Sequence, residues 1–311
     1  MSAPSALAPA AQRPGPPDGG LVVADRFQLK ERLGRGSGAE VFRAVDLSGG
    51  PDVAVKVAVD RSERQHERIR NEASVLAGLR HPSIVRFVQQ GVEPGTGPLG
   101  GRPFLVEELA LGTSLSEAAR SGMASPNVAA RWAAGLFAAL EHVHSRGLVH
   151  RDIKPANIML SGLRRSPVRI IDFGIAAVAG TAPELGVSSG TVHYMSPEQA
   201  AGGVAAPSGD VYSAGLVLLE LLTGSKAFPG TAIEALVART LRSPDVPGFL
   251  GPRWSPFLRS LTAMDSAERP SAGEAAAVAA RLIPPAPAAP LETRACPLNT
   301  AFRKRRSRQG I

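Results

Sequence analysis

The sequence predicts an α+β protein with two lobes, on the strength of three observations. Short runs of alternating or valine-rich residues come first and predict a small antiparallel β lobe, with five strands and one helix, over about residues 26–109. Long helical periodicities follow and predict a larger, mainly helical lobe over about residues 110–283. The 311 residues are also enough for two packed lobes with a substantial core.

The small lobe is expected to place its helix between its third and fourth strands. The strands are predicted at residues 27–33, 40–45, 53–59, 84–90 and 104–108. The helix is predicted over residues 61–80, because four apolar residues recur there at helical spacing: Ile69, Ala73, Leu76 and Leu79. Pro82 ends it, since a proline disfavours helical backbone in the residue before it.

The large lobe is expected to contain six helices and two short strands. The helices are predicted at residues 115–122, 127–146, 211–222, 232–241, 256–264 and 272–282, and the strands around Met159 and Ile170. The helix over residues 211–222 is strongly apolar, which is typical of a helix buried at the centre of a lobe.

The two ends of the chain differ in composition from both lobes. Residues 1–25 are rich in Ala, Pro and Gly without periodicity and predict a disordered leader, while residues 284–311 predict a disordered Pro-rich linker and basic tail. The tail has six basic side chains against one acidic one, so it holds +5 of the formal charge of +8. Such a tail could bind nucleic acid or acidic surfaces, but like-charge blocks are more often simply solvated.

The composition also limits the class of protein. Apolar residues make up 44% of the chain and charged residues 20%, which is typical of a globular protein. The single cysteine, Cys296, excludes an intrachain disulfide. No stretch approaches the ~20 apolar residues of a transmembrane helix, and Pro4 and Pro9 interrupt any signal-peptide core. We therefore expect no transmembrane segment and a cytoplasmic protein.

The chemistry is predicted to gather on two loops. Residues 150–157 have the sequence His-Arg-Asp-Ile-Lys-Pro-Ala-Asn, and residues 172–174 are Asp-Phe-Gly. Asp172 and Asn157 offer oxygen ligands of the kind that Mg²⁺ prefers, with Mn²⁺ as an alternative. Asp152 then remains as a base for an attacking hydroxyl, and Lys154 can neutralise charge on a transferring phosphoryl group.

These two motifs resemble the catalytic loop and the metal-binding motif of protein kinases, and residues 190–198 resemble the substrate-docking segment of bacterial serine/threonine members. The resemblance covers about residues 27–283, with every major motif in order. It implies a bilobal protein kinase-like fold that binds ATP and Mg²⁺ and transfers the γ-phosphoryl group to Ser or Thr hydroxyls of protein substrates. It also implies that Thr191 bonds to Asp152 and Lys154.

The resemblance further implies a phosphate-binding side to the site. Lys56 would hold phosphates and pair with Glu72, because Glu72, unlike Glu63 and Glu67, stands nine residues before His81 as the family requires. The implied ATP-binding residues lie on a glycine-rich hairpin, the strands that follow and one helix: Leu33, Gly34, Arg35, Gly36, Ser37, Gly38, Ala39, Val41, Ala54, Lys56, Glu72 and Glu108. Without the resemblance, such a hairpin would more often be a simple turn.

Three supporting contacts are also implied by the resemblance. His150 would support the catalytic loop and Phe173 rather than take protons, Asp210 would anchor the backbone of that loop, and Glu198 would form a buried ion pair with Arg269.

Glu107 departs from the family pattern. If Glu108 is the usual acid of the segment that joins the lobes, Glu107 takes the position at the back of the adenine pocket that normally carries an apolar residue or threonine. A carboxylate there must find a partner or stay protonated. A one-residue slip in the alignment explains the pattern equally well, so both interpretations remain open.

Arg151 indicates a phosphorylation switch. Kinases with an arginine before the base commonly use it to bind a phosphate on the activation segment, here residues 175–189. Thr181, Ser188 and Ser189 are the only hydroxyls of that segment. We expect autophosphorylation among these three, with Ser188 or Ser189 favoured because they lie nearer the docking segment, and self-association as one route to it.

Two rival functions are weaker. A nucleotide-binding scaffold without activity is disfavoured because no residue of the catalytic motifs is missing. A small-molecule phosphotransferase is disfavoured because residues 191–198 match protein kinases rather than those relatives.

Overall fold

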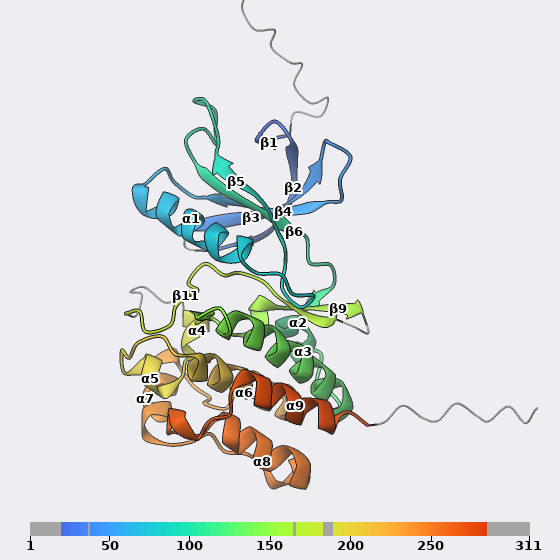
Figure 1. The fold of residues 1–311 in the computed structure, drawn as a ribbon, viewed down its shortest axis with the longest axis vertical. Coiled ribbons are helices and arrows are strands. Elements are labelled where there is room, and N and C mark those ends of the chain that lie inside the picture. The colour runs from blue at the N-terminus through green and yellow to red at the C-terminus, as the bar shows by residue number, and fades with distance from the viewer. Residues whose placement is uncertain (1–19, 37, 164–165, 183–188, 285–311) are drawn as a thin grey trace, which may run out of the picture.

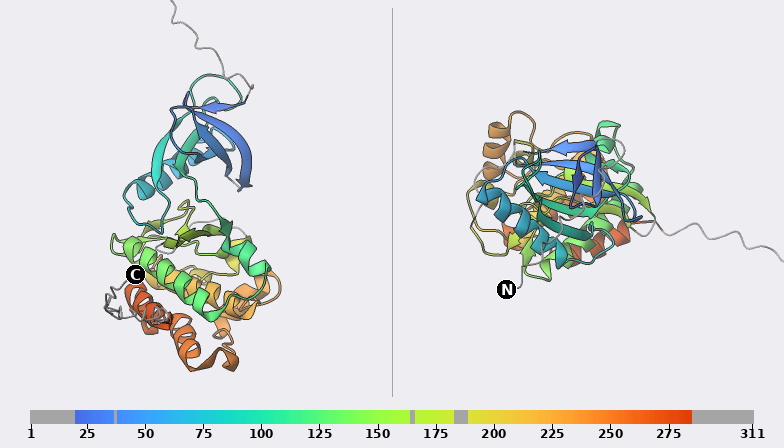
Figure 2. Two further views of the ribbon diagram at one scale, coloured as in Figure 1. Left: turned by 90° about the vertical axis from the view of Figure 1, so that its right-hand side faces the viewer. Right: turned by 90° about the horizontal axis from the view of Figure 1, so that it is seen from above.

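The protein has a small β lobe above a larger helical lobe, as Figure 1 shows. The structure is a computed structural model that describes residues 20–36, 38–163, 166–182 and 189–284. The two further views in Figure 2 show the same division into two lobes, so the predicted α+β bilobal architecture is confirmed.

The small lobe is a curled antiparallel sheet of six strands in the order β1-β2-β3-β4-β6-β5. The strands are β1 Val22–Val23, β2 Phe27–Arg35, β3 Ala39–Asp46, β4 Val53–Ala58, β5 Phe87–Val92 and β6 Pro103–Glu108. Five strands were expected. The sixth arises because Val22 and Val23, inside the predicted leader, pair with Gln28 and Phe27, and Val23 is fully buried.

The only long helix of the described small lobe, α1 (Glu63–Ala77), packs on this sheet and supplies one buried acid. Three residues of its predicted apolar stripe, Ile69, Ala73 and Leu76, are buried on the helix, whereas the fourth, Leu79, is buried just beyond its end. Glu72 lies on the same face and is only 3% exposed. A carboxylate buried to this degree needs a cationic partner.

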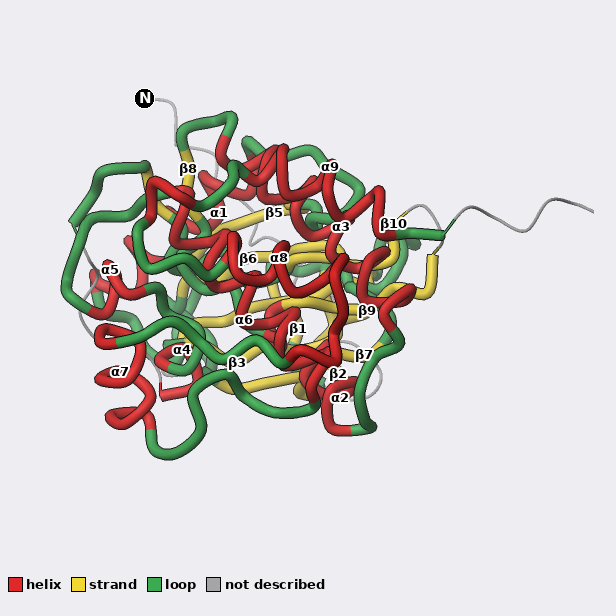
Figure 3. The backbone as a smooth tube through the Cα atoms, turned by 90° about the horizontal axis from the view of Figure 1, so that it is seen from below, coloured by secondary structure: helices red, strands yellow, loops and turns green. Residues whose placement is uncertain are grey.

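The large lobe is built around helix α6 (Pro207–Thr223), which is buried along almost its whole length, as its apolar sequence predicts. The other helices are α2 Leu115–Arg120, α3 Pro126–His144, α4 Ser189–Val192, α5 Pro197–Ala200, α7 Ala232–Leu241, α8 Gly251–Leu261 and α9 Ala272–Leu282. Seen from below in Figure 3, α4, α5 and α7 lie together at one edge of this lobe.

Short strands and single helical turns carry the loops of the large lobe. The strands are β7 Thr113–Ser114, β8 Leu148–Val149, β9 Ile158–Leu163, β10 Ser166–Ile170 and β11 Ala177–Val178, and the 3₁₀ turns are η1 Pro155–Asn157, η2 Gly248–Leu250 and η3 Ser266–Glu268. β9 pairs with β7 and β10, and β8 pairs with β11. The two catalytic motifs therefore follow β8 and β10 directly, which fixes their starting points on paired backbone.

Several predicted elements have different bounds. The helix predicted over residues 211–222 begins earlier, at Pro207, and those predicted over residues 61–80, 115–122 and 127–146 end earlier, at Ala77, Arg120 and His144. Two other shifts have a clear cause. The strand expected at residues 84–90 begins at Phe87, because Ile84 instead forms a bridge with Ile170 of the large lobe. The helix expected at residues 256–264 begins at Gly251, because Pro252 occupies the first turn, where a missing N–H costs no hydrogen bond.

One apolar core joins the two lobes. It runs from Leu76 of α1 through Ile84 to Phe173 and on to α6. Backbone hydrogen bonds reinforce the junction, because Ile170 donates to Ser83 at 2.8 Å and Val85 donates to Ile170 at 3.2 Å. This shared core holds the end of α1, and with it Glu72, in a fixed relation to the Asp-Phe-Gly segment.

Candidate active site

All five residues predicted to be catalytic line one cleft between the lobes. They are Asp152, Lys154, Asn157, Asp172 and Thr191. They come from three separate segments of the large lobe, so the fold brings together side chains up to 39 positions apart in the chain. Lys56, Glu72 and Glu107 of the small lobe line the same cleft.

Asp152 is the centre of a tight hydrogen-bond network. Thr191 donates its hydroxyl to Asp152 Oδ1 at 2.8 Å, and Lys154 Nζ donates to Asp152 Oδ2 at 2.7 Å. Lys154 Nζ also lies 2.9 Å from Thr191 Oγ1. Asn157 Nδ2 donates to the same Oδ2 and to the main-chain oxygen of Asp152, each at 2.9 Å. The expected contacts of Thr191 with Asp152 and Lys154 are therefore present.

The backbone around Asp152 is held from below by α6. Asp210 accepts hydrogen bonds from the main-chain N–H groups of His150 and Arg151, each at 2.8 Å, and from His144 Nε2 at 2.8 Å. These contacts hold Arg151 at φ 68°, a conformation that is unfavourable for a non-glycine residue. The predicted anchoring by Asp210 is thus confirmed.

His150 packs rather than titrates. Its ring lies edge-on against Phe173 with centroids 4.6 Å apart, and burial lowers its pKa. Its Nδ1 accepts a hydrogen bond from the main-chain N–H of Asp152 at 3.3 Å. A neutral, buried imidazole with this contact supports the loop, as the sequence implied.

On the other side of the cleft, one ammonium bridges two carboxylates. Lys56 Nζ lies 2.7 Å from Glu72 Oε2 and 2.8 Å from Asp172 Oδ1. An added Cβ on Gly174 would come within 3.1 to 3.4 Å of Asp172, Glu72 and Lys56. The glycine of the Asp-Phe-Gly motif is therefore what lets this cluster sit so close to the backbone.

Electrostatics keep Lys56 and Asp172 charged, whereas burial raises the pKa of Glu72 even though Lys56 acts in the opposite direction. The Lys56 ammonium lowers the pKa of Asp172 well below its ordinary value, although burial acts in the opposite direction. Burial alone would lower the pKa of Lys56, but Asp172 and Glu72 outweigh it and raise that pKa. Lys56 is therefore a permanent cation, and Asp172 a permanent anion, over the whole physiological range.

The donor set suits a magnesium–polyphosphate complex better than a metal held by protein alone. Among the described residues, no group of three or more His, Cys, Asp or Glu side chains could hold a metal ion. Asp172, however, keeps 43% of its side chain exposed to the cleft. The Asn157 amide nitrogen is committed to Asp152, which leaves its oxygen as the atom open to a cation. Mg²⁺ is commonly held by one or two such ligands plus substrate phosphates and water.

The glycine-rich hairpin lies over the cleft only in part. Gly36, Gly38, Ala39 and Val41 line it together with Lys56 and Glu72, whereas Leu33, Gly34, Arg35, Ala54 and Glu108 do not. Ser37 lies outside the described residues. Among the residues that the structure describes, nothing lies within 4 Å of a Cβ placed on Gly34, and only the Ala39 carbonyl, at 3.7 Å, faces one on Gly36. The hairpin therefore leaves open space beside its backbone, as a phosphate cradle requires.

Glu107 and Glu108 point to different surroundings. Glu108 lies outside the cleft and forms ion pairs with Arg169 and, at 3.3 Å, with Arg86. Glu107 pairs across the sheet with Ala54, lines the cleft and has no side-chain hydrogen bond or ion pair with any other residue that the structure describes. Burial first, and then the charge of Glu72, raise the pKa of Glu107 to about 8.

Several cleft residues were not assigned to the site from the sequence. They are Gln65, Arg68, Ile69, Ile171, Ile175, Gln199, Gly203 and Ala205. For Gln65 and Arg68 a signal did exist, since they precede Glu72 by seven and four positions and so share its face of the helix. Ile69 was predicted only as a core residue of the helix, and the remaining residues lie between positions 171 and 205, where periodicity does not reveal the path of the chain.

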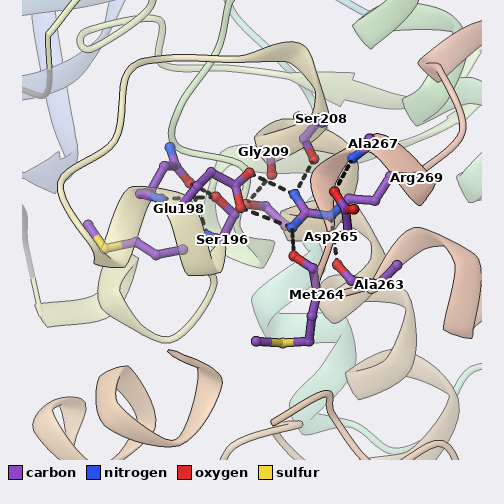
Figure 4. A network of polar contacts seen from close by, with 12 residues as sticks. Ser196, Glu198, Ser208, Gly209, Ala263, Met264, Asp265, Ala267 and Arg269 are labelled. Atoms are coloured by element: carbon purple, nitrogen blue, oxygen red, sulfur yellow. Dashed lines mark hydrogen bonds and ion pairs between the residues drawn. The ribbon is translucent and has the colours of Figure 1, made fainter. Parts of the chain in front are cut away.

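The docking segment is fixed from behind by the expected buried ion pair. Arg269 donates to Glu198 through both terminal nitrogens, at 2.7 and 2.9 Å, and its side chain is fully buried. Figure 4 shows the same guanidinium reaching the carbonyl of Ser208, at 3.0 Å, and those of Ala263 and Met264. A bidentate ion pair between an arginine and a carboxylate is among the strongest polar contacts in proteins.

Arg151 binds the activation segment even without a phosphate. Its Nη2 lies 2.6 Å from the Thr181 hydroxyl and 2.9 and 3.0 Å from the carbonyls of Thr181 and Ala182. Ser188 lies outside the described residues, as does the side chain of Ser189. Of the three candidate hydroxyls, Thr181 is thus the one for which a contact with Arg151 is defined.

In the part of the chain that the structure describes, no helix is long and apolar enough to cross a membrane. The predicted leader and basic tail lie outside the described residues except for residues 20–25 and 284.

Comparison with known proteins agrees with this geometry. The chain is 39% identical over 234 residues to serine/threonine-protein kinase PknB of Mycolicibacterium smegmatis, and 38% identical over 234 residues to PknB of Mycobacterium tuberculosis. It is 37% identical over 248 residues to a probable serine/threonine-protein kinase of Streptomyces coelicolor. These matches cover 72%, 72% and 77% of this chain but only 37%, 37% and 36% of the relatives, so the chain spans little more than a third of their length.

The family comparison covers the whole cleft. The model of the protein kinase domain matches residues 27–279, which include all the residues of the cleft and most of both lobes. The chain therefore belongs to the protein kinase domain family.

Proposed function

We propose that this chain transfers the γ-phosphoryl group of ATP to serine or threonine hydroxyls of protein substrates. The observation that carries the proposal is the position of Asp152, whose carboxylate is oriented by Asn157, Lys154 and Thr191 while it still lines the open cleft. A base must lie within hydrogen-bond reach of the proton it accepts, and this network leaves the carboxylate only one orientation.

In the proposed mechanism, Asp152 orients the acceptor hydroxyl and takes its proton. Lys154, 2.7 Å from Asp152, would stabilise the negative charge that develops on the transferring group. Thr191 links the docking segment to the same carboxylate at 2.8 Å, so a substrate chain bound along that segment is held in register with the base. Positioning of this kind accounts for much of the catalysis in phosphoryl transfer.

Lys56, Asp172 and Asn157 would serve the nucleotide. Lys56, fixed by Glu72, would bind phosphate oxygens beneath the glycine hairpin. Asp172 and Asn157 would hold Mg²⁺, and Mn²⁺ would fit the same oxygen ligands. When bound, the metal neutralises charge on the phosphate oxygens and helps to align the group that is transferred.

We further propose that the protein phosphorylates its own activation segment. The contact of Arg151 with the Thr181 hydroxyl supports Thr181, because a phosphate there would meet an arginine that is already in place. Ser188 and Ser189 remain candidates for the same switch. Self-association of two copies is one route to this reaction.

Mass spectrometry of the purified protein after incubation with ATP and Mg²⁺ tests the proposal. New phosphate on the wild-type chain and on a generic basic protein, with none in the Asp152→Asn control, is the expected result. ATP-dependent modification of neither protein would favour the scaffold role, and phosphate appearing equally in the Asp152→Asn variant would overturn the assignment of Asp152.

A further inference from the structure

The largest fully buried side chain of the described residues is an arginine that the proposed chemistry does not use. Arg239, on α7, is 0% exposed. No carboxylate of the described residues lies within ion-pair distance of it, and burial lowers its pKa. A buried charge without a counter-ion is expensive, so the contacts that it does make are informative.

Two of its three hydrogen bonds are with the docking segment, residues 190–198. Arg239 donates through Nη1 to the carbonyl of Met195 and through Nη2 to the carbonyl of His193, the latter at 2.9 Å. Its Nε donates to Ala235, one turn earlier on α7, at 3.1 Å. Its guanidinium also lies 5.3 Å from the centre of the Phe228 ring, which favours the charge.

The carbonyl between these two is also held. Ser213 of α6 donates its hydroxyl to the Tyr194 carbonyl at 2.7 Å. Three successive carbonyls, those of His193, Tyr194 and Met195, are therefore fixed by side chains from two helices. The opposite side of this short stretch faces the cleft, because Met195 lines it.

The fixed stretch is connected directly to the base. The main-chain N–H of Tyr194 donates to the Thr191 carbonyl at 2.9 Å, which closes a turn. The Thr191 hydroxyl in turn donates to Asp152 at 2.8 Å. A shift of the stretch away from α7 would therefore move the wall of the substrate site and strain the contact between Thr191 and Asp152.

We propose that Arg239 is a positioning residue for protein substrates, which sets the affinity for the acceptor chain by holding the carbonyls of His193 and Met195 from behind. Only arginine offers two terminal nitrogens in a fixed fork that can reach two carbonyls at once. A lysine would keep the charge but reach one carbonyl, and a methionine would keep much of the volume but reach neither. The inference rests on the proposed role of residues 190–198 in docking.

The first test separates the acceptor from the nucleotide. The probe is a synthetic peptide with one serine acceptor, chosen by the wild-type protein from a peptide library. In Arg239→Met the KM for this peptide should rise about tenfold, the equivalent of ~1.4 kcal/mol, because charged hydrogen bonds are worth roughly that much or more. The KM for ATP should stay within about twofold. The peptide KM of Arg239→Lys should lie between the values for Arg239→Met and the wild type.

Arg239→Met is the variant expected to fold, because replacing a buried charge by an apolar group of similar size is often close to neutral for stability. Arg242→Lys is the matched control. Arg242 is the residue that caps the C-terminal end of α7, and it lies over the same Phe228 ring, at 5.4 Å, but makes no described contact with residues 190–198. It should leave both KM values unchanged.

A second measurement does not depend on activity. Amide hydrogen exchange at Tyr194 should become faster in both Arg239 variants, while exchange along α6 stays as in the wild type. A peptide KM unchanged in folded Arg239→Met, or equal losses for peptide and ATP together with faster exchange throughout the lobe, would overturn the proposal. A wild-type protein that phosphorylates no library peptide would instead count against the proposed function.

Discussion

The two sides of the cleft hold their lysines in different ways. Lys56 lies among three carboxyl groups, since Glu72 and Asp172 form ion pairs with it and Glu107 lines the same space. Lys154 has one carboxylate, Asp152, and shares it with two neutral donors, Asn157 and Thr191. The arrangement around Lys56 is therefore determined mainly by the balance of charges, and the arrangement around Asp152 mainly by the direction of hydrogen bonds.

The difference matches what each side must do. A cluster with excess carboxyl groups attracts a cation and is completed by a metal–phosphate complex, whose own charges are part of its balance. A neutral, directional network keeps one carboxylate aimed at a hydroxyl without changing its charge state. We therefore expect substitutions to act mainly through charge near Lys56 and mainly through geometry near Lys154.

The largest effect should come from removing one carboxylate on each side. Asp172→Ala and Asp152→Asn should each lower kcat about 10²-fold or more, because one removes a metal ligand and the other the base. The measurement is initial-rate phosphorylation of a peptide at saturating ATP, with circular dichroism to show that both variants stay folded.

The comparison adds a distinction between these two variants. Asp172→Ala should also weaken the dependence of the rate on Mg²⁺ concentration, whereas Asp152→Asn should leave that dependence as it is in the wild type. Near-normal rates in either folded variant would contradict the assigned roles.

The clusters around Lys56 and Asp152 were both predicted from the sequence, through the resemblance to a known family. Lys56, Glu72 and Asp172 were found because their motifs resemble those of a known family, and the contacts of Thr191, Asp210 and Arg269 were implied in the same way. Periodicity alone placed α7 and α9, whose predicted bounds match the observed ones. Capping boxes at Thr231 and Ser271 reinforce those starts, because each satisfies free N–H groups of the first turn.

The sequence failed where burial did not follow the apolar pattern. On α7 the large apolar residues Ile233, Val237 and Leu241 are 75%, 52% and 76% exposed, whereas Arg239 is fully buried. An arginine on a helix normally predicts a solvated face, so nothing local indicated its contacts with residues more than 40 positions away. Likewise, the two-residue strand β1 is too short for periodicity to detect.

A smaller effect is expected from the activation segment, residues 175–189, which Arg151 contacts on the Asp152 side of the cleft. With Thr181, Ser188 and Ser189 all changed to Ala, the protein should start slowly and gain nothing from preincubation with ATP, because Arg151 then has no phosphate to bind. Progress curves with and without preincubation measure this, and the wild type should lose its lag after preincubation.

Thr181→Ala alone separates the candidates further. If the contact with Arg151 marks the phosphorylation site, Thr181→Ala should keep most of its lag after preincubation with ATP. Ser189→Ala should lose its lag, as the wild type does. Full activity without a lag in the triple variant would mean that the segment orders itself without modification.

Nucleotide affinity should respond more weakly, by a few fold, and only on the Lys56 side. Glu107→Met replaces an unpaired carboxyl group that lines the cleft and should change the KM for ATP or the affinity of an adenine-site inhibitor. Glu108→Gln is the matched control, since Glu108 lies outside the cleft and pairs with Arg169 and Arg86. Identical, negligible effects of the two substitutions would contradict a role for Glu107 in the nucleotide site.

The smallest effect should be a pH dependence of stability that belongs to Glu107. Its pKa is raised to about 8 in the folded protein, by burial and then by the charge of Glu72, whereas an unfolded glutamate titrates near its ordinary value of about 4.5. The folded state therefore binds the extra proton between these two values. Its contribution to stability is fully present below the lower value and is lost as the pH rises through about 8.

Glu107→Gln removes that titration but keeps the shape and the neutral charge of the protonated acid. The melting temperature of the wild type should therefore fall relative to this variant by about 2 °C or more between pH 6 and pH 9, on the scale of ~1 kcal/mol for a domain of this size. Lys56, Glu72 and Asp172 are present in both proteins, so their own pH effects largely cancel in the difference. In Glu108→Gln the difference from the wild type should stay constant, because the ion pairs of Glu108 keep its pKa below its ordinary value despite partial burial. Parallel curves for the wild type and Glu107→Gln would show that Glu107 is ionised at neutral pH, and that Lys56 then balances three carboxylates rather than two.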